Sequence, residues 1–77
     1  MNQVITVELD LSGLTCPMPL LKTRQALNKM ASGDVVRVVA TDPASERDFK
    51  VFADHSGNQL LSVDRAGSSF IFVLRKS

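Results

Sequence analysis

The only cysteine of the chain, Cys16, opens the segment Cys16-Pro17-Met18-Pro19. A cysteine thiolate is a nucleophile, so this residue is the first candidate for covalent chemistry. Pro17 and Pro19 suit the first turn of a helix, where backbone N–H groups have no partner within the helix. Cys16 is therefore expected at or beside the N-cap, where the positive end of the helix dipole lowers a thiol pKa slightly.

The dipole alone leaves a thiol mostly protonated at neutral pH, so further activation must come from neighbours or from a partner. Lys22 and Arg24, further along the predicted helix, are the candidates, because no acidic residue falls between Cys16 and Gly33. These cations would favour anionic sulfur and steer acidic partners. The alternative is an ordinary solvated helix face.

Two apolar residues, Met18 and Leu21, fall on or near the polar side of the same helix. Scattered apolar side chains on a surface are common and need no function. Beside Cys16 they could instead form a docking surface for proteins that bring a sulfur atom up to the cysteine, with methionine supplying adaptable contacts. Both interpretations remain open.

Length and composition predict one small globular domain over residues 1–77, with 44% hydrophobic residues and a net charge of +1. The near-neutral charge and the lack of Trp and Tyr give no reason to expect direct DNA binding. Met1-Asn2-Gln3 begins no secretory signal, and no apolar run is long enough for a membrane. We therefore expect a cytoplasmic protein without membrane contact.

A single cysteine excludes an internal disulfide and a Cys-x-x-Cys redox pair. Cys16 and His55 cannot supply the usual four nitrogen and sulfur ligands of a structural zinc site from one chain. No metal and no cofactor is expected.

Alternating apolar residues, helical periodicity and turn residues predict four strands and two helices. The second helix should begin at Thr41-Asp42-Pro43, which offers an N-cap followed by proline at the first helical position, and the last two strands should form a hairpin. The expected ranges are a strand at 4–9, a helix at 17–31, a strand at 35–40, a helix running to about residue 54, and strands at 60–64 and 69–74.

Helical periodicity predicts which residues of each helix face the core. The inner face of the first helix consists of Leu20, Thr23, Leu27, Met30 and Ala31, and that of the second consists of Ala44, Val51 and Phe52, with Phe49 at its edge.

Asp48 falls inside the apolar arc of the second helix, where a carboxylate needs a partner. We expect it to accept hydrogen bonds from loop backbone near the start of the first helix. A role as a catalytic acid or base beside Cys16 is disfavoured, because a negative charge opposes thiolate formation. His55 is interpreted as a residue at the helix C-terminus, favoured by the dipole, and not as a base for Cys16.

The motifs occur in a recognisable order: Leu9-Asp10 and Gly13, then Cys-Pro-x-Pro, then Thr41-Asp42-Pro43-Ala44 and Arg47-Asp48. Over essentially its whole length the chain resembles the TusA-like (SirA-like) family of small sulfur carriers. Members typically have a proline soon after the residue matching Asp48, whereas this chain has Phe49-Lys50. The difference affects the second helix and not the cysteine segment.

The resemblance implies an α/β two-layer sandwich of order β-α-β-α-β-β, with a mixed four-stranded sheet and two helices on one face. It also implies a sulfurtransferase in which Cys16 accepts sulfane sulfur as a persulfide and passes it on. The partners would be a cysteine desulfurase or other persulfide donor and a downstream acceptor protein. Family members serve tRNA thiolation, molybdenum-cofactor enzyme maturation or sulfur oxidation. Asp10, Gly13 and Asp48 would support the motif.

A lone cysteine independently suits such a carrier, since a second thiol nearby would turn the persulfide into a disulfide and release the sulfur. The alternative is a non-enzymatic regulatory module, or one that binds RNA or protein, in which Cys16 is a small buried residue. A redox sensor that forms a sulfenic acid or an intermolecular disulfide is a third possibility.

Overall fold

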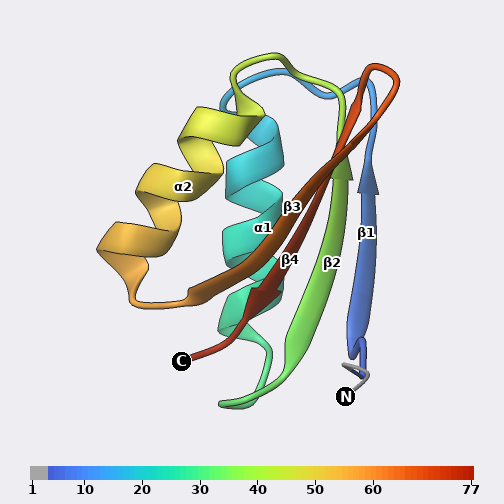
Figure 1. The fold of residues 1–77 in the computed structure, drawn as a ribbon. Helices are drawn as coiled ribbons and strands as arrows, with labels where there is room; N and C mark the ends of the chain where they lie inside the picture. Colours follow the sequence, from blue (N-terminus) through green and yellow to red (C-terminus); the bar gives the residue numbers. More distant parts are fainter. Residues whose placement is uncertain (1–3) are drawn as a thin grey trace.

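The computed structural model, which describes residues 4–77, contains a four-stranded sheet and two helices in the predicted order (Figure 1). The expectation drawn from Met1-Asn2-Gln3 concerns residues outside that range. The elements are β1 (Val7–Leu11), α1 (Met18–Asn28), β2 (Val35–Ala40), α2 (Ser45–Ser56), β3 (Gln59–Ala66) and β4 (Ser69–Arg75).

The strands lie in the order β1-β2-β4-β3. β1 runs parallel to β2, because α1 carries the chain back between them, while β4 is antiparallel to both of its neighbours. α1 packs against β1 and β2, and α2 packs against β3 and β4, so both helices cover the same face of the sheet (Figure 1). This arrangement confirms the predicted two-layer sandwich with a mixed sheet.

The core lies between this face of the sheet and the helices. Alternate residues of β2 and β4 point into it and are buried, as period-2 patterning requires. On α2 the main contribution comes from Phe49, whose ring stacks on Phe72 with centroids 4.2 Å apart and planes 9° apart. The buried residues of the two central strands that point toward the helices are Val36, Val38, Ala40, Phe70, Phe72 and Leu74.

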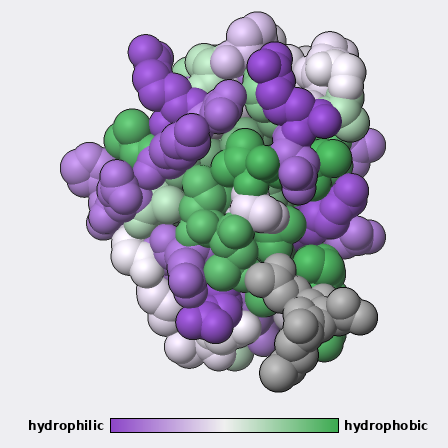
Figure 2. Space-filling model, viewed as in Figure 1, coloured by the Kyte–Doolittle hydropathy of each residue, from purple (hydrophilic) through white to green (hydrophobic). Residues whose placement is uncertain are grey.

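Residues 70–74 are all apolar, which is typical of an inner strand, and β4 lies between β2 and β3. Ile71 and Val73, on the sheet face opposite the helices, are half-buried. Figure 2 shows hydrophobic side chains gathered near the middle of the face drawn there, between hydrophilic ones. No helix within residues 4–77 has the length and apolar character needed to cross a bilayer.

The predicted inner face of the second helix was wrong in phase. The buried residues of α2 are Ser45, Phe49 and Ala53, whereas Val51 is 50% exposed. The helical projection followed the large apolar side chains and gave no weight to the small residues that share the buried stripe with Phe49. On the first helix Thr23 and Leu27 are buried as predicted, but Ala31 is exposed because α1 ends before it.

The bounds of the first strand and the end of the first helix differ most from those predicted. The first strand is displaced toward the C-terminus, because its ladder follows β2 from Val7 opposite Val36 to Leu11 opposite Ala40. α1 ends at Asn28 with Lys29 as its C-cap, whereas the helix was expected to reach residue 31. A strand end depends on its partner, which the residues of one strand do not reveal.

Candidate functional site

Cys16 lies in the loop between β1 and α1, directly before Pro17, the N-cap of α1. The Met18 N–H donates to the Thr15 carbonyl at 2.9 Å, and the Leu21 N–H donates to the Pro17 carbonyl at 3.0 Å. Cys16 is exposed. The alternative that it is a small buried structural residue is therefore wrong.

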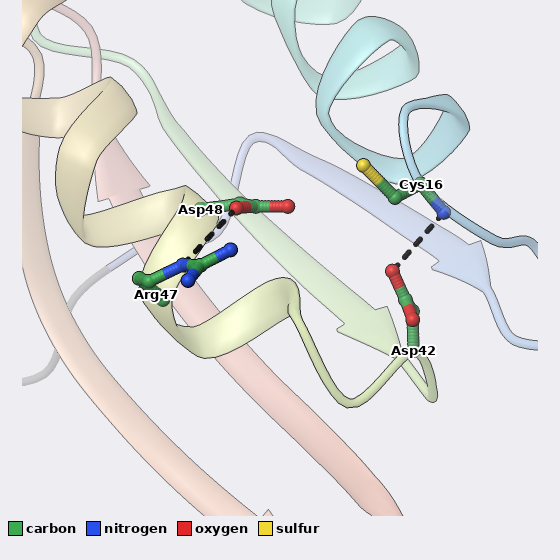
Figure 3. Close-up of polar contacts among 4 residues, drawn as sticks. All are labelled: Cys16, Asp42, Arg47 and Asp48. Atoms are coloured by element: carbon green, nitrogen blue, oxygen red, sulfur yellow. Dashed lines mark hydrogen bonds and ion pairs between the residues drawn. The ribbon is translucent and has the colours of Figure 1, made fainter.

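The loop between β2 and α2 holds the cysteine loop by two hydrogen bonds. The Cys16 N–H donates to Asp42 Oδ2 at 3.0 Å (Figure 3), and the Gly13 N–H donates to Thr41 Oγ1 at 2.9 Å. β1 and β2 are parallel, so the loops that follow them leave the same edge of the sheet and meet there. The backbone around Cys16 is thereby fixed on both sides of the turn.

Asp42 thus takes the role that the sequence analysis gave to Asp48, namely binding backbone N–H near the start of the first helix. That assignment was wrong because the carboxylate nearest the loop comes from the residue that leaves β2, not from the inner face of α2. Asp42 was expected in the segment that caps the second helix, but α2 has Ala44 as its N-cap and no side-chain capping bond. The parallel pairing of the strands is the signal that would have revealed it.

Asp10 and Gly13 shape the loop before the cysteine. Asp10 Oδ1 accepts from the Ser12 hydroxyl at 2.6 Å and from the Ser12 N–H at 3.1 Å. These bonds hold the pKa of the Asp10 carboxyl below its usual range. Gly13 adopts φ +83°, which a residue with a side chain rarely does. Asp10 and Gly13 therefore support the cysteine segment by fixing the shape of the turn that precedes it.

Asp48 lies in the first turn of α2 and is half-buried. Its carboxylate extends toward the side on which the Cys16 sulfur lies, and Arg47 Nε stands 3.9 Å from Asp48 Oδ1 on the other side (Figure 3). Of the charged side chains on α2, the Asp48 carboxylate therefore acts more strongly on the Cys16 sulfur than the Arg47 guanidinium does.

The environment raises the pKa of the Cys16 thiol. Partial desolvation is the first cause, followed by the negative charge of Asp48, a hydrogen bond from the thiol to that carboxylate, and the charge of Asp42, whereas Arg47 lowers the pKa. Desolvation and the carboxylates therefore outweigh the slight lowering of this pKa that was expected from the helix dipole.

Lys22 and Arg24 are not the cations that act on the thiol. Lys22 borders a groove between α1 and β1 beside Val7 and Leu9, whereas Arg24 lies beside Phe52 of α2. The two cations therefore point to opposite sides of α1. Arg47, which was predicted only as part of the Arg47-Asp48 motif, is the cation that lowers the pKa of Cys16.

Met18 and Leu21 are exposed to 36% and 41%, as predicted, within the first turns after the cysteine. His55 is exposed in the last turn of α2 and contributes no charge to the environment of Cys16. Within the described part of the chain, no group of three or more metal-ligating side chains occurs.

A small cavity with a volume of about 10 Å³ adjoins the cysteine. Its size is close to the minimum needed for one water molecule. Ser45, which the sequence analysis did not select, lines it from the first turn of α2. The lining residues are Cys16, Pro17, Pro19, Leu20, Asp42, Ser45, Asp48 and Phe49.

Replacing Asp48 by asparagine should lower the pKa of Cys16, because it removes the negative charge that raises this pKa most. We expect alkylation of Cys16 by iodoacetamide at pH 7 to become several-fold faster, with the midpoint of its pH profile moving to lower pH. The gain in rate is smaller than the gain in thiolate, since nucleophilicity falls with pKa. Asp54→Asn, at the exposed far end of the same helix, is the matched control. An unchanged pH profile in D48N would contradict the assignment.

The fold and the site together define a small α/β protein with one exposed, rigidly held cysteine at a strand-to-helix junction. Residues 7–76 match the family described as Sulfurtransferase TusA, so the chain belongs to the TusA family.

Comparison with individual known proteins agrees with this family assignment. The chain is 49% identical over 70 residues to the sulfur carrier protein TusA of Allochromatium vinosum, a match covering 91% of this chain and 92% of that protein. It is 35% identical over 68 residues to the protein of the same name from Pseudomonas putida, with 88% and 85% covered. The crystal structure of a SirA-like protein from Desulfitobacterium hafniense shares the fold, with a TM-score of 0.80 at 21% identity, covering 91% and 96% of the two chains. Family membership supports a role in carrying sulfur between donor and acceptor proteins.

Proposed function

We propose that this protein carries sulfane sulfur as a persulfide on Cys16, receiving it from a cysteine desulfurase or another persulfide donor and passing it to an acceptor protein. The observation that carries the proposal is the position of the thiol. It is exposed, its backbone N–H is bound by Asp42, and a proline follows it directly. A sulfur fixed in this way can be presented in the same geometry to two partners in turn.

Loading balances as a simple exchange. The Cys16 sulfur attacks the terminal sulfur of a donor persulfide, a new bond forms between those two atoms, and the S–S bond of the donor breaks. The donor sulfur leaves with the bonding electron pair and takes up the proton that Cys16 loses. No external oxidant or reductant is needed, because the sulfane sulfur only changes its carrier.

Unloading is the same kind of exchange, with Cys16 now as the leaving group. An acceptor thiolate attacks the terminal sulfur, and Cys16 leaves with the electron pair of its S–S bond. A leaving thiol with a raised pKa leaves more slowly, so the carboxylates around Cys16 favour retention of the sulfur until an acceptor has docked. A partner that brings a cation near Asp48 would weaken this effect and speed release.

The donor and the acceptor would dock on the apolar edge formed by Met18 and Leu21. Both side chains are exposed in the first turns after Cys16, and Leu21 is joined by its backbone to the N-cap. Arg24, one turn further along α1 and exposed, would meet acidic partners. Lys22 borders the other side of α1 and would contribute less to the attraction of acidic partners.

Intact mass spectrometry tests the proposal. The protein is incubated with a cysteine desulfurase and cysteine, with and without later reduction, alongside protein whose Cys16 has first been alkylated. We expect a gain of one sulfur that reduction removes and that prior alkylation prevents. A wild-type protein that gains no sulfur from this donor or from inorganic polysulfide would refute the proposal.

A further inference from the structure

The Ser45 hydroxyl is an unusual group for a protein interior. Ser45 is 2% exposed, and its Oγ has no hydrogen-bond partner among residues 4–77. Buried polar atoms are nearly always paired, so an unpaired hydroxyl suggests that a partner is bound at another stage of the working cycle.

Ser45 lines the same cavity as Cys16, so a group bound to the cysteine can come close to the Ser45 hydroxyl. The cavity holds about one atom, with a volume of about 10 Å³. Cys16 is exposed, whereas Ser45 and Phe49 are buried, so the cavity runs inward from the cysteine toward the first turn of α2. A persulfide places one additional atom on the Cys16 sulfur, directly beside this space.

We propose that the terminal sulfur of the Cys16 persulfide occupies this cavity and accepts a hydrogen bond from the Ser45 hydroxyl. The inference rests on the proposed function, and it adds a positioning residue and a resting place for the cargo. No covalent bond forms or breaks in this step. The sulfur enters and leaves by rotation about the Cα–Cβ bond of Cys16.

The carboxylates around the cavity favour a protonated terminal sulfur over an anionic one. Asp42 is engaged by the Cys16 N–H, and Asp48 offers a free acceptor toward the sulfur (Figure 3). Arg47 is the cation that faces this group, and it lies beyond the Asp48 carboxylate. A terminal S–H that donates to Asp48 and accepts from Ser45 satisfies both groups, whereas an anionic sulfur would be repelled by the two carboxylates.

This arrangement protects the sulfur from small molecules in solution. A terminal sulfur inside the cavity is less accessible to a reductant than one that points into water, so the hydroxyl should lengthen the life of the loaded protein. A hydrogen bond of ordinary strength corresponds to roughly a two- to tenfold change in that lifetime.

The experiment compares the lifetime of the loaded state in Ser45→Ala with the wild type. Both proteins are loaded, desalted and exposed to dithiothreitol, and the loss of one sulfur is followed by intact mass. We expect S45A to load fully and to lose its sulfur roughly two- to tenfold faster. Ser68→Ala, in the exposed hairpin turn, should match the wild type.

A second pair of variants separates the hydroxyl from the packing around it. Thr and Val have nearly the same shape, so Ser45→Thr and Ser45→Val differ mainly in the hydroxyl, and S45V should lose sulfur faster than S45T. This comparison also decides the matter if S45A does not fold. Alkylation of the unloaded Cys16 should be similar within the pair.

Equal lifetimes of loaded S45A and wild type, or of S45T and S45V, would overturn the inference and leave the hydroxyl serving only a buried water. Equal acceleration of sulfur loss and of alkylation of the unloaded thiol would also overturn it, because general loosening would then be the cause. A wild-type protein that never loads would instead refute the proposed function.

Discussion

Replacing Cys16 by serine is expected to abolish sulfur loading and transfer while leaving the fold unchanged. A serine oxygen cannot form the S–S bond that carries the cargo, and the chain has no other cysteine. Cys16 is exposed and its bond to Asp42 uses the backbone N–H, so the substitution leaves no core cavity and keeps the contact between the loops. The free energy of unfolding should therefore change by less than about 0.5 kcal/mol.

The measurement is the transfer of labelled sulfane sulfur from a loaded donor to C16S, followed by mass, with urea unfolding of the same protein. A matched control places a cysteine elsewhere. The double variant Cys16→Ser, Ser68→Cys has an exposed thiol in the hairpin turn, far along the chain from the proline segment. It should accept sulfur from inorganic polysulfide but exchange with protein partners at least about tenfold more slowly, because the positioning by the first loop and the docking edge is absent.

Two outcomes would contradict this account. Unfolding of C16S would show that the cysteine is needed mainly for structure. Exchange by the double variant as fast as by the wild type would show that any exposed thiol suffices and that the loops around Cys16 contribute nothing to transfer.

The features predicted correctly from the sequence were those that depend on local residue patterns. Alternation and helical periodicity gave the order of the elements, and the prolines placed Cys16 at the start of the first helix, because both signals depend on residues close together in the chain. The resemblance to a known family supplied the sheet and the sulfur chemistry.

The missed features all depend on contacts between distant segments. Asp42 reaches Cys16 across 26 positions of the chain, and only the parallel pairing of two strands brings them together. Lys22 and Arg24 seemed near the cysteine by position on the helix, but the charge on the thiol is set by Asp48 and Arg47 of the other helix. The sign of a pKa shift depends on which charges meet in space, and single-helix patterns do not contain that information.

The phase of α2 is the clearest case, and it leads to the second large expected effect. Replacing Phe49 by alanine should cost about 3–5 kcal/mol of stability, the usual range for a buried phenylalanine. Phe49 is 1% exposed and stacks on Phe72, so the substitution removes both packing volume and an aromatic pair. A domain of this length has only about 4–12 kcal/mol in total, so a large part of the stability would be lost.

Val51→Ala is the matched control on the same helix. Val51 is 50% exposed, and alanine is the better helix former, so the free energy of unfolding should change by less than about 0.5 kcal/mol. Urea unfolding followed by circular dichroism measures both variants. If F49A does not fold, Phe49→Leu provides the comparison, with an expected cost of about 1–2 kcal/mol.

The helical projection from sequence, with Val51 inside and Phe49 at the edge, predicts the reverse order of the two costs. A V51A variant less stable than F49A would therefore show that α2 packs with the other phase. That phase matters for function, because the same stripe that buries Phe49 also brings Ser45 into the cavity beside Cys16. One face of α2 thus both completes the core and lines the cavity in which we propose that the sulfur is held.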